Sequence, residues 1–343
     1  MNPRAILSAF VCSLFLAASA SVCAAQTSYA ITDLGTLTSN GYSVARSINA
    51  TGEVTGAAGN SNSNLSDIFF YSNGAMTSLG TLGGTSGIGN GINASGQVAG
   101  YSQNSSQTYR AFLSSGSTLT DIGDLGGGSA VAYAINDAGQ VVGSAVTAKG
   151  ENHPFLYSGG KMIDLGTLGS SGNDWWNSAQ GINNSGVVTG ASYDAKGNFF
   201  GFVWKNGKMT KMGTLGGAWS QAYAINNKNQ ITGLAYTKNG SAHAFVTNCA
   251  TCKLIDLGTF SGSTSTVWGF GINDSGVVVG QSTFAGTYHA FVYSGGKIKD
   301  LNGMLPAGSG WVLIEADSIN AAGQIAGMGT HNGQEHAYLL TPQ

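Results

Sequence analysis

The chain has 343 residues, of which only 9% are charged, and its formal net charge at pH 7 is −2. An average soluble domain carries about 25% charged residues. The absence of a Lys/Arg stripe excludes a nucleic-acid-binding surface and gives no attraction to an anionic membrane. Apolar residues make up 42% of the chain and are spread evenly along it, which excludes extended disorder.

The N-terminus has the composition of a secretory signal peptide. Arg4 and the free amino group form a positive start, Ala5–Ala18 is apolar, and small residues follow up to Ala25. This apolar run is too short for a transmembrane helix, and no later stretch reaches about 18 apolar residues. We therefore predict a signal peptide at residues 1–25 and a secreted, extracellular mature chain, with the periplasm or the cell surface as alternative locations.

A nine-residue pattern, Ile-Asn-x-x-Gly-x-Val/Ile-x-Gly, recurs seven times. Its copies begin at Ile48, Ile92, Ile135, Ile182, Ile225, Ile272 and Ile319. An aromatic segment of the type His-Ala-Phe and a segment of the type Asp-Leu-Gly accompany each copy. Self-similarity at a nearly fixed period indicates a repeat architecture.

Each repeat supplies four short apolar segments that we expect to be β-strands. They are rich in β-branched and aromatic residues, are separated by turn residues, and show no helical periodicity. In the Ile-Asn pattern the glycine suits the left-handed position of a bulged hairpin, and Asn229 takes that place in the fifth repeat. Two-residue turns are predicted between the third and fourth segments, at Asn73-Gly74, Gly159-Gly160, Asn206-Gly207 and Gly295-Gly296.

The two ends of the mature chain complement each other. It begins with a lone segment of the Asp-Leu-Gly type, Tyr29–Gly35, and ends just after one of the His-Ala-Phe type, His336–Leu340. Pairing these segments completes the last unit and leaves no open terminal sheet. We predict one all-β domain at residues 26–343, a seven-bladed β-propeller of four-stranded antiparallel blades, closed by the N-terminal strand. A β-solenoid or sandwich array is the alternative.

The three recurring patterns resemble those of bacterial extracellular HAF-repeat proteins. The family is named for the His-Ala-Phe triplet, found here at His243 and His289, and the resemblance covers essentially the whole mature chain. The histidine is replaced by Ser/Asp, Arg and Gly in the first, second and fourth repeats, and the aspartate by Ser78 and Lys211. The resemblance implies a secreted repeat protein and transfers no active-site residues.

The four cysteines divide into two pairs. Cys12 and Cys23 lie in the predicted signal peptide, where a lipoprotein acylated at Cys23 is an alternative with a poorly matching pattern. Cys249 and Cys252 could form a redox motif or half of a zinc site, but the first needs a helix N-terminus and the second needs two more ligands. In an exported protein we predict a local disulfide between Cys249 and Cys252.

Tryptophans mark the candidate binding face. The connections between the second and third segments, and between successive repeats, vary in length and sequence, and function concentrates on such loops. The between-repeat connections hold Trp175, Trp176, Trp219, Trp268 and Trp311. We interpret them as an arc of aromatic platforms for sugar rings or a partner protein. The alternative is that these rings fill gaps between blades.

Other polar residues are weaker candidates. Four histidines repeat in register, which favours a structural role over metal binding, and His331 lies off-register as a lone surface group. The repeated aspartates are expected to bond turn amides. Glu315 and Asp317 are two apart in a strand-like segment, should face the same way, and carry the possibility of a carbohydrate-active enzyme.

The sequence therefore predicts a non-catalytic, exported binding propeller. It would present an aromatic-lined loop face to a glycan or an extracellular protein, as a monomer with no cofactor, no metal and no membrane span after signal removal. The first alternative is a structural scaffold of the cell surface or extracellular matrix. The second is a polysaccharide hydrolase or lyase.

Overall fold

The computed structural model describes residues 28–60, 65–170, 176–260 and 266–343. Within them the secondary structure is 28 strands and one short 3-10 helix, η1 (Leu301–Met304), which confirms the predicted all-β class. No helix among these residues is long and apolar enough to cross a membrane. The predicted signal peptide and Trp175 lie outside the described residues.

The strands form five sheets of four strands and one sheet of eight. Their bounds are, in chain order, β1 (Tyr29–Asp33), β2 (Gly41–Ile48), β3 (Val54–Asn60), β4 (Ser66–Ser72), β5 (Ala75–Gly80), β6 (Gly83–Ile92), β7 (Val98–Asn104), β8 (Tyr109–Ser115), β9 (Thr118–Asp121), β10 (Gly126–Ile135), β11 (Val141–Thr147), β12 (Asn152–Ser158), β13 (Lys161–Asp164), β14 (Ser178–Ile182), β15 (Val188–Tyr193), β16 (Phe199–Lys205), β17 (Lys208–Lys211), β18 (Gly216–Ile225), β19 (Ile231–Thr237), β20 (Ala242–Val246), β21 (Ile255–Asp256), β22 (Val267–Ile272), β23 (Val278–Phe284), β24 (Thr287–Ser294), β25 (Lys297–Asp300), β26 (Trp311–Ile319), β27 (Ile325–His331) and β28 (Gln334–Pro342).

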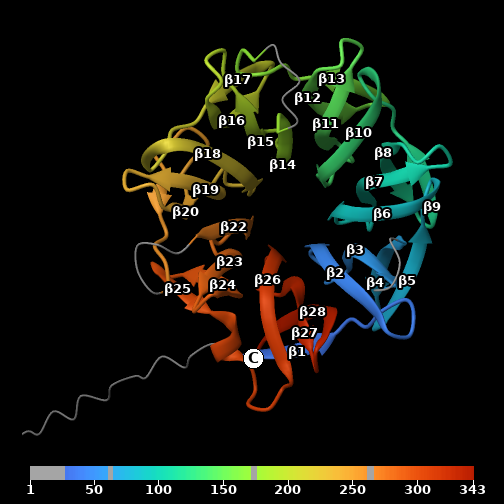
Figure 1. The fold of residues 1–343 in the computed structure, drawn as a ribbon, viewed down its shortest axis with the longest axis vertical. Helices are drawn as coiled ribbons and strands as arrows, with labels where there is room; N and C mark the ends of the chain where they lie inside the picture. The colour runs from blue at the N-terminus through green and yellow to red at the C-terminus, as the bar shows by residue number, and fades with distance from the viewer. Residues whose placement is uncertain (1–27, 61–64, 171–175, 261–265) are drawn as a thin grey trace, which may run out of the picture.

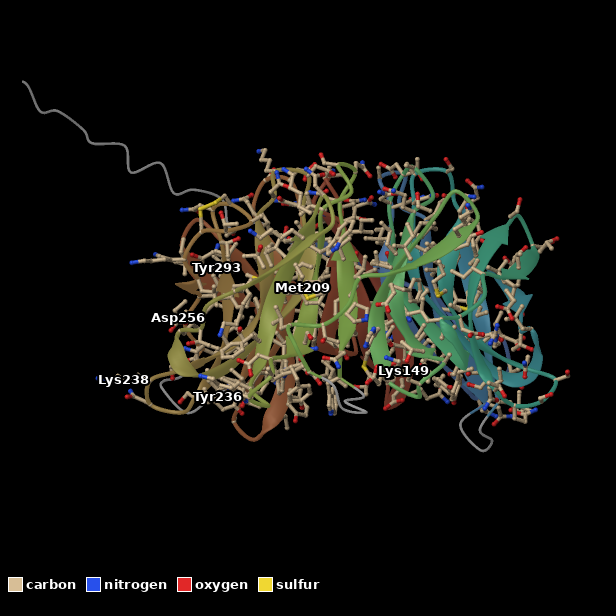
Figure 2. All side chains as sticks on the ribbon, turned by 90° about the horizontal axis from the view of Figure 1, so that it is seen from above. Lys149, Met209, Tyr236, Lys238, Asp256 and Tyr293 are labelled. Atoms are coloured by element: carbon tan, nitrogen blue, oxygen red, sulfur yellow. A yellow bond between two sulfur atoms is a disulfide. The ribbon has the colours of Figure 1, made fainter. Side chains whose placement is uncertain are left out.

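The sheets surround a common centre (Figure 1). The strand that ends in Ile-Asn is the innermost of each four-stranded unit, and these strands are β2, β6, β10, β14, β18, β22 and β26. The eight-stranded sheet consists of two such units, β2–β5 and β6–β9, which are joined by a single bridge between Ser66 and Ser86. Seen from the side, connecting segments cover the two opposite faces, with Lys149, Tyr236 and Lys238 near the same face (Figure 2).

The first described strand completes the sheet of the last three. β1 pairs antiparallel with β28, with Tyr29 opposite Pro342 and Asp33 opposite Tyr338. The backbone nitrogen of Gln343 donates to the carbonyl oxygen of Ser28 at 2.9 Å, so the two ends of this part of the chain lie side by side. This is the strand pairing expected from the sequence.

The asparagine of every Ile-Asn pair is buried and links its unit to the next. In Asn183 the side-chain oxygen accepts from the backbone nitrogens of Ser185 and Val187, and the side-chain nitrogen donates to the carbonyl oxygen of Asn226. The same donor–carbonyl bond, 2.8 to 3.3 Å long, runs from each asparagine to the next. Asn320 then donates to Asn49, the first of the series, at 3.1 Å. We call this set of bonds the asparagine circle.

Apolar packing between the sheets rests on one buried ring from each third strand. These rings are Phe69, Phe112, Phe155, Phe202, Phe245, Phe291 and Tyr338, all fully buried. The last glycine of the nine-residue Ile-Asn pattern makes room for them: a Cβ at Gly143 would collide with the carbonyl oxygen of Val131 and lie 2.8 Å from the ring of Phe155. Glycine is therefore required at this position of the second strand, where the backbone of the first strand leaves no room for a Cβ.

The turn predictions are confirmed where the backbone can be compared. Asn229 has a positive φ of 60°, as expected for the residue that replaces glycine in the fifth repeat. Asn73 and Gly74 both have positive φ, as a primed two-residue turn requires. A disulfide joins Cys249 and Cys252, whose Cα atoms are 5.1 Å apart.

The expected extension of the fourth strand through Asp-Leu-Gly is wrong in most repeats. β9, for example, ends at Asp121, because the side chain of Asp121 accepts from the backbone nitrogen of Gly123 at 2.8 Å and turns the chain. Gly123 adopts a positive φ of 89°. The repeated aspartates therefore bond turn amides, as predicted, and end the strand in doing so.

We predict that Asn183→Ala lowers the free energy of unfolding by about 2–4 kcal/mol, because buried donors and acceptors lose their partners. Asn183 is 3% exposed. The matched control is Asn184→Ala in the same turn, an exposed residue for which we expect less than about 1 kcal/mol. Denaturant unfolding followed by circular dichroism measures both, and equal losses would contradict the role given to the asparagine circle.

Candidate functional site

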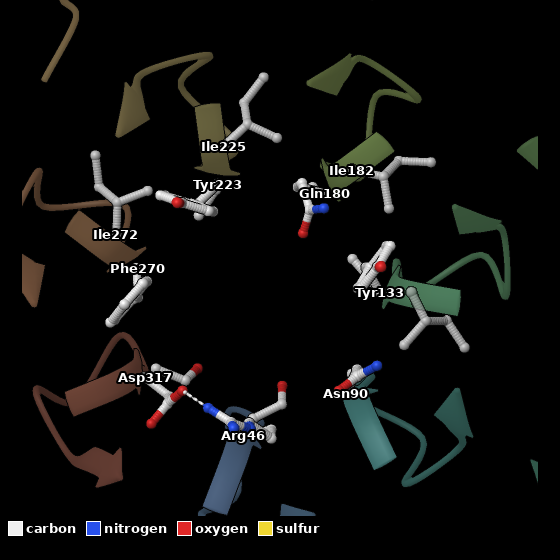
Figure 3. A pocket seen from close by; sticks show the side chains of 18 of the residues that line it. Arg46, Asn90, Tyr133, Gln180, Ile182, Tyr223, Ile225, Phe270, Ile272 and Asp317 are labelled. Atoms are coloured by element: carbon white, nitrogen blue, oxygen red, sulfur yellow. Dashed lines mark hydrogen bonds and ion pairs between the residues drawn. The ribbon is translucent and has the colours of Figure 1, made fainter. Parts of the chain in front are cut away.

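The innermost strands aim a set of different side chains at one central cavity of about 440 Å³. The residue two positions before each Ile-Asn pair lines it, because alternate residues of a strand face the same way. The set consists of Arg46, Asn90, Tyr133, Gln180, Tyr223, Phe270 and Asp317 (Figure 3). One repeated position therefore supplies a cation, two amides, three aromatic rings and an acid to a shared space.

Sequence reasoning named only Asp317 of this set, although a signal for the whole set was present. The Ile-Asn pair recurs in every repeat, whereas the residue two positions earlier changes its chemical class from repeat to repeat. When one position of a repeated pattern changes its residue type from repeat to repeat, the packing of the repeats does not depend on the side chain at that position. The ring arrangement is needed to show that these seven positions meet.

An ion cluster occupies one side of the central cavity. A single nitrogen of Arg46, Nη1, lies 2.8 Å from Asp317 Oδ1 and 3.1 Å from Glu315 Oε1. Both carboxylates reach the same guanidinium, so Glu315 and Asp317 do face the same way, as the sequence indicated. The other oxygen of Asp317, Oδ2, is buried and has no hydrogen-bond partner among the described residues. Burial, and then the charge of Glu315, raise the pKa of Asp317 well above its usual range, although Arg46 opposes them.

Tyr133, Tyr223 and Phe270 add aromatic rings to the rest of the cavity lining (Figure 3). Tyr223 and Phe270 make an edge contact with their ring centroids 5.5 Å apart. Burial raises the pKa of Tyr223 to about 12 and also raises the pKa of Tyr133, so both phenols stay protonated at neutral pH. The Tyr223 hydroxyl donates to Gln221 Oε1 at 3.2 Å.

A second cavity of about 470 Å³, which we call the aromatic pocket, opens where loops meet the start of β18. Its lining includes Trp176, Tyr193, Asn198, Phe199, Trp219 and Gln221. The rings contact one another in sequence, with centroid distances of 4.8 Å for Tyr193–Phe199 and 5.9 Å for Phe199–Trp219. Trp176 is 64% exposed. An apolar platform beside amide groups is thereby open to solvent.

Side chains on one face of β18 line both the aromatic pocket and the central cavity. Trp219, Gln221 and Tyr223 alternate along this strand and are each only partly buried, whereas Ser220 and Ala222 between them are buried. Gln221 lines the aromatic pocket and accepts the bond from Tyr223, which lines the central cavity. The two cavities thus share one row of side chains.

The structure corrects the predicted arc of loop tryptophans. Trp219, Trp268 and Trp311 lie in the strands β18, β22 and β26, because these strands begin earlier than their apolar segments indicated. Trp268 is partly buried and contacts Tyr288 with ring centroids 5.9 Å apart. Trp311 is only 9% exposed and belongs to the buried core, as expected from the alternative interpretation that these rings fill gaps between blades. Trp176 and Trp219 alone, among the described tryptophans, line the aromatic pocket.

The His-Ala-Phe and Asp-Leu-Gly segments meet through a repeated pair of side chains. His153, His243 and His289 place Nδ1 within 2.7–2.9 Å of Asp164, Asp256 and Asp300, respectively. Where the sequence departs, another contact takes the place of the histidine–aspartate pair: Arg110 bonds Asp121, Ser78 donates to Asp67, and Lys211 lies over the ring of Phe200.

These pairs support a structural role for the repeated triplets. They also correct the residue that was matched to the histidine in the fourth repeat. In the fourth repeat the histidine is replaced by Phe200 and not by Gly201, since Phe202 lies opposite Lys211 as Phe155 lies opposite Asp164. His331 is not a lone surface group, because its Nδ1 lies 3.0 Å from Asp33 Oδ2.

No family model and no curated protein sequence matches the chain. Among solved structures it is similar to YCF48 bound to D1 peptide, with a TM-score of 0.54 and 9% identity over 92% of this chain and 96% of that one. It is also similar to a puromycin-hydrolysing peptidase of Mycobacterium tuberculosis, with a TM-score of 0.55 and 12% identity over 88% and 49% of the two chains. A third is the extracellular domain of the putative one component system BT4673 from B. thetaiotaomicron, with a TM-score of 0.54 and 10% identity over 92% and 40%.

The chain spans about half the length of the peptidase and less than half of the BT4673 chain. At identities of 9–12%, these similarities show the fold alone. YCF48 is a β-propeller protein, and the sheets of the present chain have that architecture.

We predict that Arg46→Met lowers the free energy of unfolding by about 2–3 kcal/mol at pH 7, because it leaves the buried Asp317 charge uncompensated. The folded-state pKa of Asp317 is raised, so its protonated form is favoured by folding. The stability that folding gains from protonated Asp317 is fully present below about pH 4, the pKa of this carboxyl in the unfolded chain. It is lost as the pH rises through the pKa of Asp317 in the folded protein. The deficit of the variant should therefore shrink as the pH falls from 7 towards 4.

Urea unfolding of the wild type and Arg46→Met at several pH values measures this difference. Lys205→Met, which removes an exposed charge, serves as the control and should change stability little at any pH. A deficit that stays constant between pH 4 and 7 would show that the Arg46 contact is not electrostatic in origin.

Proposed function

We propose that the six sheets form a single seven-bladed β-propeller, in which the eight-stranded sheet counts as two blades and β1 closes the ring. The asparagine circle supports this arrangement, because its seventh bond returns to the first asparagine. The antiparallel pairing of β1 with β28 supports the closure, since it supplies the fourth strand of the last unit.

Deletion of residues 29–35 tests the closure. We expect the deletion to lower the melting temperature by at least about 8 °C, because it removes the buried side chains of Tyr29 and Leu34 and the outer strand of one blade. Thr32→Ala, an exposed position in the same strand, is the control and should have little effect. A truncated protein as stable as the full chain would rule out closure by β1.

We further propose that the chain is an exported, non-catalytic binding protein whose aromatic pocket holds a glycan. The observation that carries this proposal is the aromatic pocket itself, with the exposed ring of Trp176 beside Trp219 and Gln221. Sugar rings present apolar C–H faces that pack on aromatic planes, and their hydroxyls bond amides. With its oxygen engaged by Tyr223, the Gln221 amide presents its nitrogen as a donor.

The size of the pocket favours a small ligand unit. A volume of about 470 Å³ lies within the range of roughly 300–1,000 Å³ that is typical of small-molecule sites. Export, monomeric state and kinship with the HAF-repeat proteins belong to this proposal, as predicted from the sequence. A side chain or loop of an extracellular protein is the second occupant that the same aromatic surface would accept.

Glycan-array binding of the wild type and Trp219→Ala tests the site. We expect at least about tenfold weaker binding of the recognised glycan, because loss of a buried aromatic contact costs about 1.4 kcal/mol or more. Tyr109→Ala removes an exposed aromatic residue that does not line this pocket and should leave binding unchanged. Identical profiles for wild type and Trp219→Ala would exclude the aromatic pocket as the glycan site.

A carbohydrate-active enzyme is the second candidate function. It is favoured by one observation, the buried Asp317 carboxyl of raised pKa beside Glu315 in the central cavity, because perturbed carboxyl groups gather at catalytic sites. Polysaccharide turnover that is lost in Glu315→Gln or Asp317→Asn would establish it in place of a binding role.

A further inference from the structure

His331 departs from the pattern of the other histidines. His153, His243, His289 and His336 all belong to third strands and face an aspartate of a fourth strand. His331 ends β27, the second strand of its unit, yet it reaches the same aspartate as His336. One unit therefore contains two imidazoles against a single carboxylate.

The three groups form a compact donor set. Asp33 Oδ2 lies 3.0 Å from His331 Nδ1 and 2.9 Å from His336 Nδ1, and one ligand atom from each residue lies within 4.8 Å of the others. Zinc bonds nitrogen and oxygen ligands at about 2.0–2.1 Å, which places neighbouring ligands of a tetrahedron roughly 3.3 Å apart. The observed distances of 3.0 and 2.9 Å from Asp33 Oδ2 to the two Nδ1 atoms are close to that spacing.

The surroundings hold these groups in place and leave them accessible. Trp311 stacks on His331 with ring centroids 4.7 Å apart and an interplanar angle of 3°. The backbone nitrogen of Gly35 donates to Asp33 Oδ1 at 2.8 Å, which fixes the carboxylate. All three side chains keep partial exposure, 15–30%, so that water can complete a coordination shell.

We propose that Asp33, His331 and His336 form a binding site for a divalent transition-metal ion of the zinc class. Two imidazoles and one carboxylate suit Zn²⁺, and solvent water takes the fourth position. Each histidine binds through Nδ1, so its remaining ring proton resides on Nε2. The two cysteines of the described chain are joined in a disulfide and do not compete for the metal.

The site lies at the joint between the two ends of the chain. Asp33 belongs to β1, whereas His331 and His336 belong to β27 and β28. The unfolded chain separates these ligands by about 300 residues, so the metal binds the folded state preferentially and stabilises it. A bound metal ion would cross-link β1 to β27 and β28 and so stabilise the pairing of β1 with β28.

Isothermal titration of ZnCl2 into the chelator-treated mature protein, prepared without a histidine tag, tests the proposal. We expect one Zn²⁺ per chain with micromolar or tighter affinity, and a rise in melting temperature that a chelator reverses. His331→Phe keeps a ring to stack on Trp311 but removes the ligand nitrogen, and should weaken binding at least about tenfold. His289→Phe, which disrupts a pair with a single histidine, is the control and should bind zinc as the wild type does.

Two results would overturn the proposal: a wild type that binds no zinc at millimolar concentration, or a His331→Phe variant that binds it unchanged. X-ray absorption of the zinc-loaded wild type needs no variant and covers the case in which His331→Phe does not fold. We expect two imidazoles in the shell of the bound zinc, and a shell with one imidazole or none would assign the metal to another place.

Discussion

The side-chain hydrogen bond from each Ile-Asn asparagine to the carbonyl oxygen of the next asparagine is the interaction on which the rest of the structure depends. These side chains are buried, and an unpaired buried amide is costly, so each unit must sit where its neighbour supplies the partner. The same side chain also holds the turn after the innermost strand through its bonds to backbone nitrogens. Local turn and neighbour spacing are therefore set by one residue type. The return of the series from Asn320 to Asn49 gives all the units a common centre.

Positions that repeat and positions that diverge have different roles in this molecule. The buried rings of the third strands and the glycines that make room for them recur because every unit packs the same way. The pairs between third and fourth strands vary in their members but keep a contact, as Arg110 with Asp121 and Ser78 with Asp67 show. The residues that face the central cavity are under no such demand. They carry the chemical variety that a specific site requires, and the row from Tyr223 to Trp219 leads from that cavity to the aromatic pocket.

The sequence predicted the parts of the fold that depend on local physics. Period, strand composition and turn residues such as Asn229 are local properties, and they lead to the all-β class. The pairing of β1 with β28 was predicted because the segment types at the two ends complete one repeat. The site was predicted only in part, with Trp176 and Trp219 at one pocket and Trp311 misplaced on the surface. The start of an innermost strand depends on pairing with its neighbour, and the partners of His331 depend on contacts across about 300 residues. Neither is encoded in a window of neighbouring residues, so periodicity does not reveal them.

The proposed closed ring has no preferred starting point in the chain, and a circular permutant tests this proposal most directly. The backbone of Gln343 bonds that of Ser28, so a short linker can join these ends while new termini are opened at the exposed turn Gly159-Gly160 between β12 and β13. Thermal unfolding of the permutant, followed by circular dichroism, is the decisive measurement. A ring held by the asparagine circle predicts a native-like spectrum and a single cooperative transition within a few degrees of the parent chain. A permutant that fails to fold, or that unfolds in separate stages from the new ends, would contradict it.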